Sequence, residues 1–112
     1  MIETNEIGEI IAVYQKHGWV LRRVLLSAAL KRRAGDNILP LANGVQITAS
    51  DIDAAWFSRP PQPGGVPWEI RHLSKTPYAL LENIDETSTE FEDTLRAVES
   101  RLRETVAQVK SA

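Results

Sequence analysis

The chain contains no cysteine, and this single absence excludes several kinds of chemistry. Without thiols there can be no disulfide, no thiolate zinc site, no iron–sulfur cluster and no cysteine nucleophile. A chain without cysteine is also compatible with a reducing compartment.

Long apolar runs are missing too. The first ten residues, MIETNEIGEI, lack the basic start and the continuous apolar stretch of a signal peptide. Apolar runs elsewhere are far shorter than the roughly 20 residues that a membrane span needs. We therefore expect a soluble, cytoplasmic protein that makes no use of a membrane.

The familiar catalytic and cofactor motifs are absent as well. The chain has no Gly-rich phosphate loop, G-x-S-x-G elbow, H-E-x-x-H pair or EF-hand loop. Gly64 and Gly65 lack the spacing of a dinucleotide fingerprint. We assign no catalytic, cofactor-binding or metal-binding residue from motifs, and we expect no cofactor.

The residues that are present predict one globular domain spanning 1–112. Apolar residues make up 43% of the chain and charged residues 25%, the balance of an ordinary soluble domain. Charge is unevenly spread, because residues 16–33 carry six basic and no acidic side chains, while residues 82–93 carry six acidic and no basic ones. We expect these segments to neutralise each other in the fold or across a dimer. The alternative is a basic patch for an anionic partner.

The N-terminal third predicts a helix followed by a strand. Ile7, Ile10, Ile11 and Tyr14 form one apolar stripe, so residues 4–17 predict a helix capped by Thr4 or Asn5. Residues 19–26 favour a strand, in which Arg22 and Arg23 would point to opposite faces, and a short helical turn follows to residue 33. One continuous helix over 19–33 is the alternative. Residues 34–50 predict a connector with a brief strand near 45–48.

The centre of the chain predicts a strand meander. Residues 50–59 read as a strand with apolar residues on both faces, and the Pro/Gly-rich loop PPQPGGVP follows. Residues 66–73 and 78–84 then predict a hairpin. Apolar patches on both faces of such a sheet commonly mark interfaces, so we expect self-association.

A long C-terminal helix is predicted over residues 88–110. Its apolar seam runs through Phe91, Leu95, Val98, Leu102, Thr105 and Val109. Thr87 and Glu90 have the spacing of a capping box. We expect i,i+4 ion pairs between Glu92 and Arg96 and between Glu99 and Arg103.

These elements predict an α+β fold. We expect a two-layer sandwich in which an antiparallel sheet of three to four strands packs against the N- and C-terminal helices, in the order α-β-β-β-β-α.

Two constellations suggest chemistry or nucleic-acid binding. Asp53, Glu69 and Arg71 resemble the PD-(D/E)xK nuclease pattern, in which two carboxylates hold a divalent metal. No proline precedes Asp53, however, and Arg71 stands where that pattern has a lysine, which departs from its chemistry. The element order also resembles the double-stranded-RNA-binding fold. The acidic start of the last helix would repel phosphate, so nucleic acid is disfavoured as a partner.

Our interpretation is a protein-interaction or ligand-binding module that forms a homodimer and binds an unknown protein or small molecule. The alternatives are a nucleic-acid-binding protein that uses residues 16–33 and a metal-dependent hydrolase with its site at Asp53 and Glu69. The candidate interaction surface consists of Arg22, Arg23, Phe57, Arg59, Arg71 and His72.

The segments HGWVLRRVLL, DIDAAWFSR, WEIRHL and PYALLE resemble a small bacterial protein family without assigned activity. The resemblance covers most of residues 17–82. It implies an α+β fold and brings no mechanism or site residues.

Overall fold

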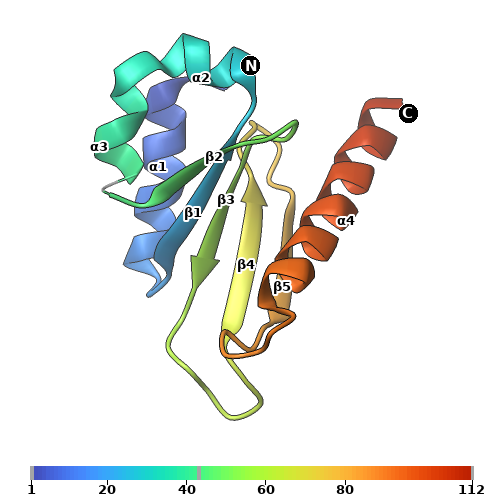
Figure 1. Cartoon of the computed structure of the whole chain (residues 1–112). Coiled ribbons are helices and arrows are strands. Elements are labelled where there is room, and N and C mark those ends of the chain that lie inside the picture. Colours follow the sequence, from blue (N-terminus) through green and yellow to red (C-terminus); the bar gives the residue numbers. More distant parts are fainter. Residues whose placement is uncertain (1, 43, 112) are drawn as a thin grey trace.

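A five-stranded sheet with helices on both faces forms the protein in the computed structural model (Figure 1). The structure describes residues 2–42 and 44–111, with side chains described as far as residue 108. In chain order, the elements are α1 (Thr4–Lys16), β1 (Val20–Leu26), α2 (Ala28–Ala34), a 3-10 turn (Gly35–Asn37), α3 (Ile38–Ala42), β2 (Gln46–Ala49), β3 (Ala54–Ser58), β4 (Pro67–His72), β5 (Ala79–Asn83) and α4 (Phe91–Ser111).

The predicted α+β class is confirmed, and so is the meander of β3, β4 and β5. The strand order is β2-β1-β3-β4-β5. The sheet has one strand more than the three to four predicted, and it is mixed because β2 runs parallel to β1. Parallel neighbours require a crossover connection, and α2 and α3 supply it here.

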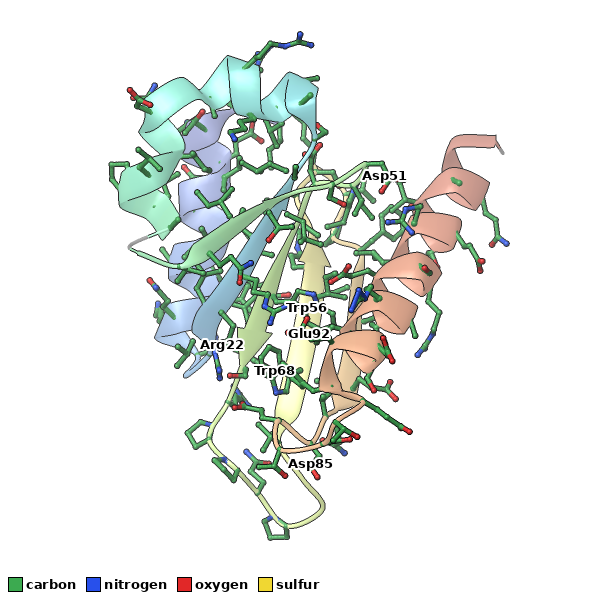
Figure 2. All side chains as sticks on the ribbon, in the orientation of Figure 1. Arg22, Asp51, Trp56, Trp68, Asp85 and Glu92 are labelled. Atoms are coloured by element: carbon green, nitrogen blue, oxygen red, sulfur yellow. The ribbon has the colours of Figure 1, made fainter. Side chains whose placement is uncertain are left out.

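The prediction of two layers was wrong, because the helices cover both faces of the sheet. One core, on the face covered by α1, α2 and α3, includes Ile7, Val24, Leu30 and Phe57. The other core lies under α4 and includes Leu25, Trp56, Trp68, Ile70 and Leu102 (Figure 2). We call these sides the α1 face and the α4 face. Apolar residues therefore alternate to both sides of β3, as strands covered on both faces require.

A β-bulge in β1 corrects the prediction for its two arginines. Leu21 pairs with Phe57 and Arg23 with Trp56, so Arg22 is an extra residue in the strand. The extra residue lets both arginines reach the α4 face, where Arg22 stacks 4.7 Å from the Trp68 ring and Arg23 lies 5.8 Å from that of Phe91.

Residues 19–33 form a strand and then a short helix, so the alternative of one continuous helix was wrong. Ser27 ends the strand and caps α2, because its hydroxyl accepts a hydrogen bond from the Leu30 amide at 3.2 Å. The predicted caps differ in detail. Glu3, and not Thr4 or Asn5, caps α1 through a capping box with Glu6.

The C-terminal helix α4 differs from the prediction in its apolar seam and in the partners of its charged side chains. Leu95, Val98 and Leu102 are buried as expected, but Val106 and not Thr105 continues the seam, and the Val109 side chain lies outside the described residues. Neither predicted i,i+4 pair is found. The carboxylates bond to the sheet instead, Glu92 to Arg23 and Glu99 to the indole nitrogen of Trp56 at 2.8 Å.

Candidate interaction surface

The six predicted surface residues do not form one surface. Phe57 is 0% exposed and stacks on Tyr14 with ring centroids 4.1 Å apart, so it belongs to the core under α1. Arg22 and Arg23 lie on the α4 face, and Arg59 and Arg71 lie at the two ends of β3 and β4. The predicted set is therefore dispersed over the molecule.

Arg22 and Arg23 join the sheet to the acidic segment before and within α4. Arg22 lies 3.1 Å from Glu86, and two nitrogens of Arg23 contact Glu92 at 2.9 and 2.5 Å. The hydrogen bonds between Arg23 and Glu92 raise the pKa of the guanidinium and lower the pKa of the carboxyl group. The expected neutralisation between the basic and acidic segments is therefore confirmed for these two arginines.

Arg59, Arg71 and His72 hold neighbouring backbone segments in place. Arg59 lies 4.7 Å from the Trp19 ring and donates to the carbonyl of His17 at the end of α1. Arg71 donates to the carbonyl of His72 and reaches those of Ser74 and Thr76 at 3.5 Å. A ring nitrogen of His72 lies 2.8 Å from the Ser74 hydroxyl. The contacts of Arg71 and His72 fix the turn between β4 and β5.

Asp53 and Glu69 are not brought together. Asp53 lies beside Leu73 at the start of β3 and accepts hydrogen bonds from the amide and hydroxyl of Ser27 at 2.6 and 3.2 Å. Glu69 pairs with Phe57 of β3. Phe57 lies four residues after Asp53, so Asp53 and Glu69 are about 13 Å apart along the strand at ~3.3 Å per residue. One metal ion cannot bridge that distance. Within the described parts of the chain, no group of three or more His, Asp or Glu side chains is arranged to hold a metal ion.

On the α1 face, the helices leave β5 exposed and cover β4 only in part. There the side chains of β4 and β5 pair in register as Pro67 with Asn83, Glu69 with Leu81 and Arg71 with Ala79. We call these six residues the open face. Leu81 is 61% exposed, the most exposed large apolar side chain recorded for the described residues, and Ala79 and Asn83 are exposed beside it.

The outer edge of β5 is unpaired, because β5 is the last strand of the sheet (Figure 1). The His72 amide donates to the Tyr78 carbonyl and the Ile84 amide donates to the Val66 carbonyl. Hydrogen-bonded residues alternate along an antiparallel strand, so Leu80 and Glu82 also face β4. The amides and carbonyls of Ala79, Leu81 and Asn83 therefore point away from the sheet.

Two hollows flank the open face. One, of about 350 Å³, lies between α1 and β4 and is lined by residues that include Ile10, Val13, Tyr14 and Arg71. The other, of about 280 Å³, includes Trp19, Arg59, Pro67 and Leu81. Aromatic and apolar side chains beside the exposed side of β5 suit a protein partner.

Tyr14 connects α1 to the open face. Its hydroxyl donates a hydrogen bond to Glu69. Burial of the phenol raises the pKa of Tyr14 above its usual value, and the hydrogen bond and the negative charge of Glu69 raise it further.

We expect Tyr14 to ionise late in an alkaline titration. Because its pKa is raised in the fold, the native protein keeps the phenol proton when an unfolded chain would lose it, so stability falls as pH rises above about 10. Ultraviolet absorbance of tyrosinate is the measurement, and the chain has two tyrosines. The variant Tyr14→Phe should lose the part of the titration that lies above the ordinary tyrosine range. A titration that keeps this part in Tyr14→Phe would contradict the assignment.

Comparisons of the chain with protein-family models, with curated proteins and with solved structures gave no match. The resemblance to a bacterial family therefore stays a prediction. Across residues 2–42 and 44–111, no helix combines the length and the apolarity needed to cross a bilayer.

The residues that the sequence analysis missed are Ala79, Leu81 and Asn83. Their shared face follows from the alternation of residues 78–84. A second signal was also present, since no further strand pattern follows residue 84. In a meander, the last strand is an edge unless a later strand pairs with it.

Proposed function

We propose that this protein is an interaction module that binds a protein segment by adding a strand to the edge of β5. Adding a strand satisfies edge amides and carbonyls, and side chains on the neighbouring face give specificity. The observation that carries the proposal is the unpaired edge of β5 beside the exposed Leu81.

The composition of this edge supports the proposal. Proteins commonly protect an edge strand with an outward charge, an internal proline, a bulge or a covering segment. The three residues whose backbone amides and carbonyls point away from the sheet are Ala79, Leu81 and Asn83. None of them is charged and none is proline. We also propose a cytoplasmic location, supported by the absence of cysteine in the chain.

A labelled peptide of residues 77–84, PYALLENI, should bind the protein with a dissociation constant between about 1 μM and 1 mM, measured by fluorescence anisotropy. The variant Leu81→Lys should weaken binding at least tenfold, which corresponds to about 1.4 kcal/mol. Leu39→Lys is the matched control, because Leu39 is 56% exposed on α3, far along the chain from this edge.

Amide hydrogen exchange shows whether the peptide binds at the outer edge of β5. Exchange of the Ala79, Leu81 and Asn83 amides should slow when peptide is added, while the Leu80 and Glu82 amides, which face β4, should change little. The absence of binding at millimolar peptide would contradict the proposal. Equal weakening by Leu39→Lys would contradict it too.

A further inference from the structure

We infer that the strand added to the edge of β5 is β5 of a second copy of this chain. The two sheets then join into one continuous antiparallel sheet, with a two-fold axis at Leu81. The inference rests on the proposed function, because it needs the same free edge. Self-association of this kind is a closed, isologous contact, since each copy offers the surface that it receives.

The residues of the edge select one register. With Leu81 opposite Leu81 of the second copy, Ala79 lies opposite Asn83, and all three outward-facing residues pair, giving up to about six hydrogen bonds. A shift of two residues would bring Pro77 opposite Asn83. Pro77 has no amide proton and cannot donate, so the shifted ladder is weaker. Pro77 thus marks the natural end of the ladder.

Side chains on both faces agree with this register. The two Leu81 side chains meet on the open face, where each is 61% exposed in the single chain. On the α4 face, Leu80 lies opposite Glu82, so the two Glu82 carboxylates are not directly opposed. Like charges directly opposite each other would destabilise the pair. The Glu82 carboxylate already has a partner, since Arg101 of α4 approaches it at 3.5 Å.

The loops at the two ends of β5 have opposite charge. In the antiparallel arrangement, the turn before β5 in one copy lies at the level of the loop after β5 in the other. The turn carries the exposed Lys75. The loop carries the exposed Asp85, which Figure 2 labels, and Glu86, which already pairs with Arg22. Lys75 therefore approaches an acidic loop at each end of the interface, which favours the antiparallel pairing over a parallel one.

α4 packs on the side of the sheet formed by β4 and β5 and contacts both strands. Leu95, Val98 and Leu102 pack in the core that contains Trp56 of β3 and Ile70 of β4. In the joined sheet, the two α4 helices would therefore lie on the same side, next to the two β5 strands.

Single cysteines test the register directly, because the natural chain has none. Residues directly opposite in a hydrogen-bonded pair have Cα atoms about 5.5 Å apart, within the range of a disulfide. Leu81→Cys should therefore give a covalent dimer under mild oxidation with oxidised glutathione. Ala79→Cys alone should not, since its symmetry mate is about 13 Å away at ~3.3 Å per residue. A mixture of Ala79→Cys with Asn83→Cys should cross-link, and Leu39→Cys is the exposed control.

Sedimentation velocity over a wide concentration range gives the second measurement. The wild-type protein should move from monomer to dimer, and Leu81→Lys should weaken dimerisation at least tenfold, while Leu39→Lys should not. A protein that stays monomeric but binds the 77–84 peptide overturns this inference and leaves the proposed function standing. A monomer that binds no peptide overturns both. A dimer in which Leu81→Cys fails to cross-link places the interface elsewhere and overturns the inference.

Discussion

Replacement of Trp56 by alanine is expected to lower the free energy of unfolding by about 3–5 kcal/mol. Trp56 is 0% exposed in the core under α4, and its ring meets that of Trp68 edge-on, with centroids 6.0 Å apart. Its indole nitrogen also donates to Glu99, which ties β3 to α4. The variant therefore loses packing, an aromatic contact and a hydrogen bond together.

Such a loss is large against the total of about 5–15 kcal/mol for a domain. Urea unfolding followed by circular dichroism is the measurement, and an unchanged slope would show that only stability has changed. Glu99→Ala separates the hydrogen bond from the packing, with an expected loss of about 1–3 kcal/mol for a buried donor left without a partner.

Leu39→Ala serves as the control for Trp56→Ala. Leu39 is 56% exposed, so its truncation should change stability by less than about 0.5 kcal/mol. A loss below about 1 kcal/mol for Trp56→Ala would show that the indole is not packed between β3 and α4.

The strand meander could be predicted because its signals are local. The alternation over residues 66–73 places Trp68 and Ile70 on one side and Glu69 and Arg71 on the other, and the structure keeps this division. A pattern with a period of two residues needs no knowledge of distant partners.

The layer arrangement could not be predicted in the same way. The sequence shows apolar residues on both faces of β3, such as Trp56 and Phe57. That pattern requires a cover on each face but does not say what covers it. We interpreted the second apolar face as part of an interface, whereas α1 covers it and buries Phe57 completely.

The other differences between the predicted and the observed structure arise from contacts between residues that are far apart in the sequence. The predicted Glu92–Arg96 pair is absent because Glu92 bonds to Arg23, which the bulge at Arg22 helps to aim at α4. An exposed helix pair contributes only a few tenths of a kcal/mol, so a bidentate contact to Arg23 displaces it easily. The β5 edge depends on strand order, which the lack of a strand pattern after residue 84 already indicated.

A substitution in the core under α1 and a substitution in the core under α4 should change the free energy of unfolding independently of each other. Ile7 and Leu102 are both 0% exposed, Ile7 under α1 and Leu102 under α4. Ile7→Ala and Leu102→Ala should each lower the free energy of unfolding by about 2–5 kcal/mol. Because the sheet separates the two side chains, their effects should add to within about 0.5 kcal/mol.

The test of additivity needs a folded double variant, so the milder Ile7→Val, with an expected loss of about 0.5–1.5 kcal/mol, is combined with Leu102→Ala. Ile70→Val with Leu102→Ala is the comparison, because both residues belong to the core under α4. Neighbours in one core should show a coupling of about 0.5–3 kcal/mol. A comparable coupling between Ile7 and Leu102 would mean that the sheet does not separate two cores. The residues of the α1 face and of the α4 face would then belong to one core, contrary to the division that the structure shows.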